Sequence, residues 1–453
     1  NMIYDIMFDG ETSIPMTPTG NGAYSAVIPA SAYTPGEMIR YRFESEDGAG
    51  HASRFPLFHD PLNAPEFFGT MAQVDIESTM PVYHWFIDQS RYGADSSSES
   101  RSSIFYNGVL YDNIMTRTRG GSTSNSSMPK KSHKFDFNTA HHFKYAVDAG
   151  KVEEMNLNTT YSDKTYLRRM LAWNAYEAID APGCKSFLVH LRRNNQFFGV
   201  QNFEEQVDDD FLERHGFDTN GALFKVMGED NSVSPQNRIF NQKTRRHDPL
   251  VDEARDLVTD LQQWNRESHA FDRMDVANLI NYVTLTTLMR DGDTGRKNQY
   301  FYRDVDGSGD WYVFPWDKDL TYGMKWASGT TIFHDECEPP VSMCIPGGGI
   351  HQNVVWKSGI IKQLYLRRLR SVLDQLLQEA STPTAQRWHE SRIADLLATH
   401  MPDLMLDYQV WGEPWTYGID ADPGEMNTNL TINTYLAGAR SYFYGNSSLP
   451  DAQ

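Results

Sequence analysis

The sequence has no long apolar run, few cysteines and a deficit of basic side chains. None of its apolar stretches approaches the roughly 20 residues that a membrane helix requires, so we expect no membrane span in this chain. The 60 acidic side chains outnumber the 41 basic ones, and the net charge of −19 repels nucleic acid and anionic membrane surfaces. Nucleic-acid binding is therefore not expected.

Three cysteines say little about the redox compartment. Cys337 and Cys344 are close enough in sequence to form a small disulfide loop, which would leave Cys184 free; three reduced thiols are an equal alternative. An acidic balance fits an extracellular protein, and we expect a secreted or cell-surface location. The chain opens directly on strand-like alternation with no signal peptide, as expected for a processed or truncated N-terminus.

The length of 453 residues predicts one large catalytic unit and an accessory module. Residues 1–60 alternate short apolar stretches with Gly-containing turns, which predicts a fragment of an immunoglobulin or fibronectin III-like β-sandwich. The Pro-rich segment that follows predicts a linker over 61–80. Residues 81–445 form the expected main domain, and 446–453 a tail.

The main domain shows a mixed pattern, so the predicted fold class is α+β. Its first part contains strand patterns, a helix and a hairpin, and helices dominate afterwards. The predicted strands and hairpin arms cover residues 82–87, 103–106, 113–119, 133–137, 187–192, 197–203, 299–303 and 311–315. The predicted helices cover residues 164–179, 207–215, 249–264, 272–290, 356–380, 384–400 and 431–444.

The most informative segment is residues 290–298 (RDGDTGRKN), followed across a predicted hairpin by residues 316–323 (WDKDLTYG). In phosphoryl transfer an Asp orients the attacking hydroxyl, an Asn about five residues later helps to hold a divalent ion, and a later Asp binds the metal. Asp293 and Asn298 have this spacing, with Asp317 and Asp319 as the later carboxylates. These oxygen ligands suit Mg²⁺ or Mn²⁺.

A Gly/Ser turn and a basic strand precede this segment. In the turn, backbone N–H groups can meet phosphate, and a Lys on the next strand can pair with the α/β-phosphates. The candidate phosphate-binding residues are Arg119, Gly120, Gly121 and Ser122 in the turn, with Lys131 or Lys134 on the strand. The linker 204–207, with Glu205 and Val207, is the expected place for adenine. This linear order is that of a bilobal kinase.

At these residues the chain resembles the CotH kinase family, from about residue 81 to residue 442. The resemblance rests on six blocks at residues 115–122, 129–137, 157–163, 198–208, 298–304 and 315–323. It implies an atypical, bilobal protein-kinase fold that uses ATP and a divalent metal to phosphorylate Ser or Thr of surface or spore-coat proteins. It further implies Asp293 as the catalytic residue, with Asn298, Asp317 and Asp319 on the metal.

Two other interpretations stay open. The helix over 164–179 has Glu177 as its only Glu, which leaves no confident partner for the nucleotide-binding Lys. A catalytically inactive pseudokinase, acting as an extracellular structural or adhesion module, is therefore an alternative. A metal-dependent hydrolase that uses the same Asp cluster is the weaker one, since the kinase-like order of motifs would then be accidental.

Overall fold

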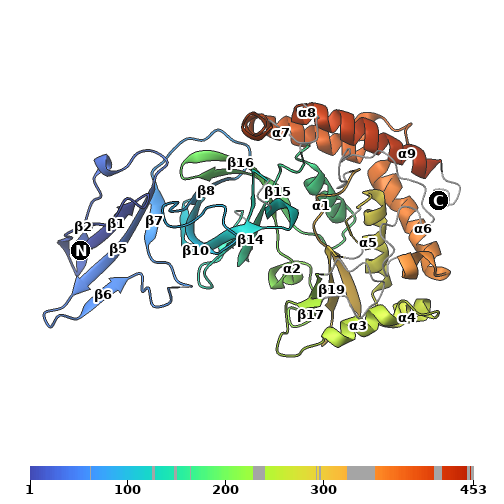
Figure 1. The fold of residues 1–453 in the computed structure, drawn as a ribbon, viewed down its shortest axis with the longest axis horizontal. Coiled ribbons are helices and arrows are strands. Elements are labelled where there is room, and N and C mark those ends of the chain that lie inside the picture. Colours follow the sequence, from blue (N-terminus) through green and yellow to red (C-terminus); the bar gives the residue numbers. More distant parts are fainter. Residues whose placement is uncertain are drawn as a thin grey trace. The chain divides into compact units, whose positions relative to one another are not determined.

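The computed structural model describes most of the chain. The described residues are 1–61, 63–124, 128–146, 150–163, 165–227, 240–291, 293–294, 297–323, 352–412, 421–445 and 449. They belong to two compact units, drawn in Figure 1. Unit 1 contains residues 1–162, 187–206 and 402–413; unit 2 contains 163–186, 207–401 and 414–453. Each unit is described by itself.

Unit 1 begins with a five-stranded antiparallel sheet in the order β2-β1-β5-β6, with β7 also paired to β5. Its strands are β1 (Met2–Ile6), β2 (Thr12–Ile14), β5 (Met38–Glu46), β6 (Ala52–Phe55) and β7 (Phe68–Met71). A separate hairpin joins β3 (Thr17–Gly20) and β4 (Ala23–Ser25). The sheet thus extends into the segment predicted as a linker, and the sandwich assignment stays a prediction.

The second part of unit 1 is a closed seven-stranded barrel in the order β10-β11-β14-β16-β15-β8-β9. Its strands are β8 (Val82–Phe86), β9 (Ser100–Tyr106), β10 (Val109–Arg119), β11 (Ser132–Asp136), β14 (Glu154–Thr159), β15 (Ser186–Arg193) and β16 (Gln196–Glu204). Among the described strand pairings of the barrel, β8 and β15 run parallel. Closure pairs every strand on both sides, so the barrel has no exposed edge.

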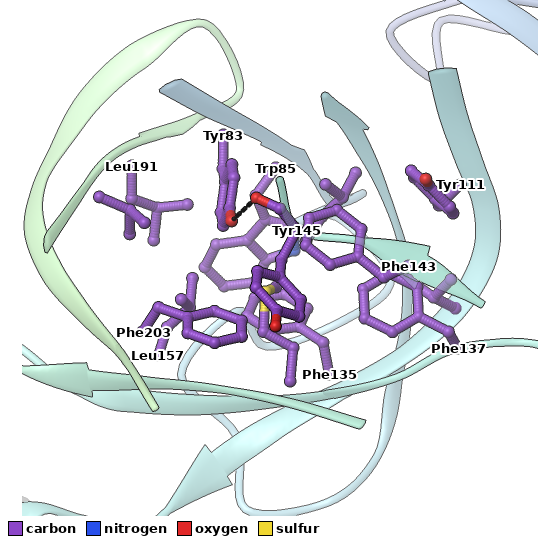
Figure 2. Close-up of a cluster of buried hydrophobic side chains, with 14 of the residues drawn as sticks. Tyr83, Trp85, Tyr111, Phe135, Phe137, Phe143, Tyr145, Leu157, Leu191 and Phe203 are labelled. Carbon is purple, nitrogen blue, oxygen red and sulfur yellow. Dashed lines mark hydrogen bonds between the residues drawn. The ribbon is translucent and has the colours of Figure 1, made fainter. Parts of the chain in front are cut away.

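Aromatic side chains fill the barrel (Figure 2). Trp85 meets Phe135 edge-on at 5.5 Å between ring centroids, and Phe137 stacks on Phe143 at 4.8 Å. The hydroxyl of Tyr83 donates a hydrogen bond of 3.2 Å to the Tyr145 carbonyl, which satisfies its buried polar group. The apolar side chains that alternate along the strands therefore face inward and form a packed core.

Residues 402–413, at the end of the long helix α7 (Trp388–Trp411), also belong to unit 1. There the ammonium of Lys130 lies 2.5 Å from the carboxylate of Asp407, and both side chains are buried. His190 lies 2.7 Å from Asp403, and the indole N–H of Trp411 donates to a barrel carbonyl at 2.6 Å. These polar contacts attach the end of the helix to the barrel.

Unit 2 is built around a four-stranded antiparallel sheet in the order β18-β17-β19-β20. Its strands are β17 (Ala222–Val226), β18 (Phe240–Gln242), β19 (Gln299–Arg303) and β20 (Trp311–Pro315). Helix α5 (Val276–Leu288) begins at Asp275, whose side chain accepts from the Asn278 backbone N–H, and lies between the sheet and α6 (Ile360–Val372) (Figure 1). This apolar helix therefore forms much of the unit's core.

The remaining helices surround this core. They are α1 (Arg168–Ala178), α2 (Asp209–Arg214), α3 (Val251–Asp260), α4 (Arg266–Arg273), α8 (Pro423–Met426) and α9 (Ala437–Tyr444), with the 3₁₀ and π segments η5 (Gln352–Trp356), η6 (Leu373–Leu377), η7 (Thr384–Gln386) and η8 (Asn427–Leu436). The α+β class is confirmed by this mixture of helices and sheets. Among the described residues, we find no helix with the length and apolarity to cross a membrane.

The structure bears on one of the three cysteines. Cys184 is buried, and its thiol is not part of a disulfide. Cys337 and Cys344 lie outside the described residues, so their pairing stays a prediction. Most of the predicted tail at 446–453 lies outside them as well.

Candidate active site

The residues predicted for the site fall into two groups, one in each unit. The turn 119–122, both candidate lysines and Glu205 lie in unit 1, whereas Val207 and the predicted catalytic and metal-binding residues lie in unit 2. The structure therefore gives the arrangement of residues within each group.

The acidic group gathers at one end of the β19–β20 hairpin. Asn298 directly precedes β19, and Trp316 directly follows β20. Gln299 pairs with Pro315 at this end, and the Trp316 backbone N–H donates to the Asn298 carbonyl at 3.1 Å. Asp317 is thereby held beside Asn298, although 18 residues lie between the two in the sequence. The hairpin therefore brings these two segments together.

Asn298 is bonded to the predicted catalytic residue. Its side-chain amide Nδ2 donates to Asp293 Oδ2 at 2.8 Å and to the Asp293 carbonyl at 3.0 Å. Because the NH₂ group is turned to Asp293, the amide oxygen remains as the acceptor that a cation would use. Burial raises the pKa of Asp293, while the nearby Lys297 ammonium lowers it and the carboxylates of Asp317 and Asp291 raise it further.

Two of these residues have a left-handed backbone. Asn298 has φ 58° and Asp317 has φ 54°, a region that Asn and Asp tolerate better than other residues with a Cβ. Such conformations carry strain that clusters at functional sites, where the surrounding structure holds it. The residue types at both positions thus serve the backbone as well as the chemistry.

Asp317 and Asp319 converge on one cation, the guanidinium of Arg169 on helix α1. Arg169 Nη2 lies 3.6 Å from Asp317 Oδ1 and 3.5 Å from Asp319 Oδ2. Sequence reasoning missed Arg169, because nothing in its spacing on the helix indicates a contact with a loop about 150 residues later.

Two further residues of this region also escaped the sequence analysis. Lys318 Nζ lies 2.5 Å from Asp291 Oδ2, and both side chains are fully buried. Burial lowers the pKa of Lys318, but the attraction of Asp291 outweighs it and the pKa is raised, so the ammonium stays charged. Both residues lie inside the two segments singled out from the sequence, but a charged residue type does not by itself distinguish a buried position from a solvent-exposed one. The pair joins the 291–298 loop to the 317–319 loop.

A divalent metal fits this donor set. Among the described residues, no group of three or more His, Cys, Asp or Glu side chains is arranged to hold a metal ion. Mg²⁺, however, is commonly bound by one or two carboxylates plus waters and substrate phosphates. The position of Arg169 shows that the carboxylates of Asp317 and Asp319 already share a single positive charge. The amide oxygen of Asn298 is a suitable additional ligand.

In unit 1 the Gly/Ser turn follows β10. Gly120 has φ 90°, and a Cβ there would lie 2.1 Å from the Thr123 hydroxyl, so the turn requires glycine. The Thr123 hydroxyl donates to the Arg119 carbonyl at 3.3 Å, and the Arg119 side chain donates to Asn158 on β14. The turn therefore closes on itself by hydroxyl contacts, as its Ser/Thr content leads one to expect.

The lysines of the basic strand have different surroundings. Lys134 Nζ lies 2.8 Å from Asp136 and 2.6 Å from Glu154, and is largely buried between them. Lys131 is mostly buried too, and its carbonyl accepts from Gln201. Which of the two meets phosphate stays open, as it was from the sequence. Their neighbour Lys130, which the sequence analysis did not single out, has the structural contact with α7 given above.

The predicted adenine segment follows β16. Glu204 and Glu205 are buried, and Asn156 Nδ2 donates to the Glu204 carbonyl at 3.3 Å and to Gln206 Oε1 at 3.1 Å. Val207 is fully buried as well. The segment is thus held by side-chain hydrogen bonds from β14, and the assignment of adenine to it stays a prediction.

Comparison with known proteins identifies the family of the chain. A search of curated proteins finds no match to the chain. A family model described as "CotH kinase protein" matches residues 116–415, well over half of the 453 residues. The match spans both the basic strand and the acidic loops, and the chain belongs to the CotH kinase family.

Proposed function

We propose that the protein transfers the γ-phosphoryl group of metal-bound ATP to a Ser or Thr hydroxyl of a secreted or surface protein. The observation that carries the proposal is the convergence of Asp293, Asn298 and Asp317 at one end of the β19–β20 hairpin. Membership of the CotH kinase family supports it. The two units would serve as the lobes of an atypical kinase, unit 1 on the nucleotide side and unit 2 with the catalytic loops.

In this proposal Asp293 acts on the acceptor. Its carboxylate accepts a hydrogen bond from the acceptor hydroxyl and orients the oxygen toward the γ-phosphorus. A bond forms between that oxygen and phosphorus, and the bond from phosphorus to the β–γ bridging oxygen breaks, releasing ADP. The hydroxyl proton passes to Asp293. The Asn298 amide fixes the carboxylate through the hydrogen bond of 2.8 Å.

Asn298, Asp317 and Asp319 would hold the divalent metal. When bound, Mg²⁺ or Mn²⁺ neutralises the charge of the phosphate groups. The chain has a net charge of −19, so such neutralisation matters for an anionic nucleotide. On the nucleotide side, the 119–122 turn offers backbone N–H groups and Lys131 or Lys134 a positive charge, with adenine against Glu205 and Val207.

The test is phosphate transfer by an Asp293→Asn variant. The amide keeps the shape of the side chain but cannot accept the proton, so ³²P incorporation into a Ser/Thr acceptor or into the chain itself should be lost. Asp256→Asn provides the matched control, because Asp256 is exposed on α3 and far along the chain from these loops. Equal incorporation by the wild type and the Asp293 variant contradicts the proposal.

An inactive pseudokinase is the second candidate, and three ion pairs favour it. Arg169 already pairs with Asp317 and Asp319, and Glu177, the only Glu of α1, lies 2.8 Å from Lys185. A pseudokinase of this kind would act as an adhesion or assembly module. Thermal stabilisation by magnesium nucleotide without any transfer of phosphate, or no stabilisation at all, would identify it.

A further inference from the structure

Helix α1 presents two consecutive arginines to two different acidic groups of unit 2. Arg168 is fully buried; its Nη1 donates to Asp163 Oδ1 and its backbone N–H to Asp163 Oδ2, each at 3.1 Å. Arg169 instead reaches the loop after β20, where Asp317 and Asp319 lie. Arg168 is bound to a neighbour in sequence, whereas Arg169 pairs with the residues proposed to hold the metal.

The contacts of Arg169 are longer than the fully buried Lys318–Asp291 ion pair. At 3.5 and 3.6 Å they exceed the 2.7–2.9 Å of a charge-assisted hydrogen bond, whereas Lys318 and Asp291 are 2.5 Å apart. The guanidinium therefore neutralises two carboxylates without a short bidentate bond to either. Such an electrostatic pairing is more easily exchanged for another cation than the Lys318–Asp291 pair.

The three side chains of this pairing differ in how exposed they are to solvent. Arg169 is 9 % exposed and Asp319 16 %, but Asp317 is 39 % exposed. The Asp317 carboxylate is therefore open to solvent, where a metal ion would approach it, whereas the Arg169 side chain is largely buried. Two cations at the same pair of carboxylates repel each other, so binding of the metal weakens the hold on Arg169.

We propose that Arg169 is an internal counter-ion that occupies the metal-binding carboxylates of the nucleotide-free protein and moves to the phosphates when metal–nucleotide binds. The proposal rests on the function proposed above and adds a regulatory step to the same site. The planar guanidinium suits phosphate oxygens, to which it can form two parallel hydrogen bonds. Metal alone is then bound weakly, and metal together with nucleotide strongly.

The experiment compares wild type with Arg169→Gln by titration calorimetry, first with MgCl₂ alone and then with the magnesium complex of β,γ-imido-ATP. Loss of the competing charge should lower the Kd for Mg²⁺ alone about tenfold, the effect of about 1.4 kcal/mol of removed competition. Loss of the phosphate contact should raise the Kd for the magnesium nucleotide by a similar factor.

Two control variants define the role of the charge. Arg169→Lys keeps a cation on the helix and should restore weak binding of Mg²⁺ alone. Arg367→Gln removes one positive charge from an exposed position of α6 in the same unit and should leave both affinities at the wild-type values.

The outcomes separate this inference from the function on which it rests. Equal Mg²⁺ affinity in wild type and Arg169→Gln overturns the displacement, and tighter Mg²⁺ binding with unchanged nucleotide affinity overturns the move to phosphate. In both cases wild type still binds magnesium nucleotide and the proposed function stands. If neither chain binds magnesium nucleotide, the proposed function is contradicted, and the inference with it.

A measurement on the unaltered chain covers the case in which the Gln variant does not fold. The arginine Nε–Hε resonance of Arg169, assigned with the Lys variant, should shift when magnesium imido-ATP is added and much less with imido-ATP without metal. An unchanged resonance with the magnesium complex overturns the inference.

Discussion

The ammonium of Lys318 and the carboxylate of Asp291 form a fully buried ion pair at 2.5 Å. Lys318 stands between Asp317 and Asp319, and Asp291 stands two residues before Asp293, so the pair connects the proposed catalytic and metal-binding loops. Tyr176 of α1 also raises the pKa of Lys318 through its electrostatic interaction. The pair therefore ties the segment that contains Asp293 to the segment that contains Asp317 and Asp319.

Replacing Lys318 by Met should destabilise unit 2 by about 3–5 kcal/mol, because it leaves the Asp291 carboxylate buried without its partner. Urea unfolding followed by tryptophan fluorescence measures this change. Lys357→Met, at an exposed position of the same unit, should change the unfolding free energy by less than about 0.5 kcal/mol. A Lys318→Met protein as stable as the Lys357→Met control contradicts the structural role of the pair.

Combining Lys318→Met with Asp291→Asn tests the same pair by a double-mutant cycle. The double variant removes both charges, so it should regain part of the stability that either single variant loses. Additive losses would show that the two groups are not coupled.

Local patterns predicted many elements of this fold, but strands β14 and β17 were not among them. The helix predicted over 272–290 is observed as α5 (Val276–Leu288), which starts later because Asp275 caps it, and the predicted hairpin has its turn at Asn194–Asn195. Barrel closure could not be predicted, because the parallel β8–β15 pair joins strands about 100 residues apart. No local pattern encodes such a pairing.

The candidate site, like the fold, could be predicted from the sequence only in part. The sequence predicted that Asp293, Asn298 and Asp317 belong to one site, and the structure brings them together through the hairpin and through a hydrogen bond that was not predicted. Arg169 and the Lys318–Asp291 pair were not predicted, since each depends on contacts between segments distant in sequence: helix α1 with a loop for Arg169, and two loops for the pair. A charged residue in a helix usually faces solvent, and only the tertiary structure reveals the exceptions.

The pH dependence of phosphate transfer should report Asp293. Burial raises the pKa of this carboxyl, so activity that needs its ionised form should fall with decreasing pH at a higher pH than the ordinary Asp pKa of about 3.9 predicts. Lys297 lies 3.5 Å away and lowers this pKa. Lys297→Gln should therefore move the acid limb of kcat/KM upward by roughly half to one pH unit. An unmoved or lowered limb argues against Asp293 as the titrating group.

Replacing Lys130 should affect stability and replacing Lys131 should affect nucleotide binding, although the two residues are adjacent in the sequence. Lys130→Met leaves Asp407 buried without its cation and should cost about 3–5 kcal/mol of unfolding free energy. Lys131→Met should instead weaken nucleotide binding by about tenfold if Lys131 is the phosphate-binding lysine, with a small change in stability. Unfolding curves and nucleotide titrations of both variants give the comparison; a nucleotide defect seen instead in Lys134→Met would assign that role to Lys134.

His389 of α7 should make the protein sensitive to mild acid. Its ring is fully buried, with Nδ1 2.8 Å from the Leu376 carbonyl and Nε2 3.1 Å from the hydroxyl of Tyr322, and burial lowers its pKa to about 4. Protonation therefore favours the unfolded chain, where the pKa is about 6.5. The stability due to the neutral ring is complete above pH 6.5 and is lost as the pH falls from 6.5 toward 4. The loss should reach about 3 kcal/mol.

The measurement is the unfolding free energy of wild type and His389→Gln at several pH values between 7 and 4. Carboxylates contribute to the acid sensitivity of both chains, so the difference between the two curves isolates the histidine. His389→Gln should be less stable at pH 7, where its side chain replaces a well-packed ring, but should lose less stability on acidification. Parallel curves would mean that His389 either titrates normally in the folded protein or is not protonated on unfolding. The first alternative conflicts with hydrogen bonds in which Leu376 accepts from Nδ1 and Tyr322 donates to Nε2, because a protonated ring cannot accept at Nε2.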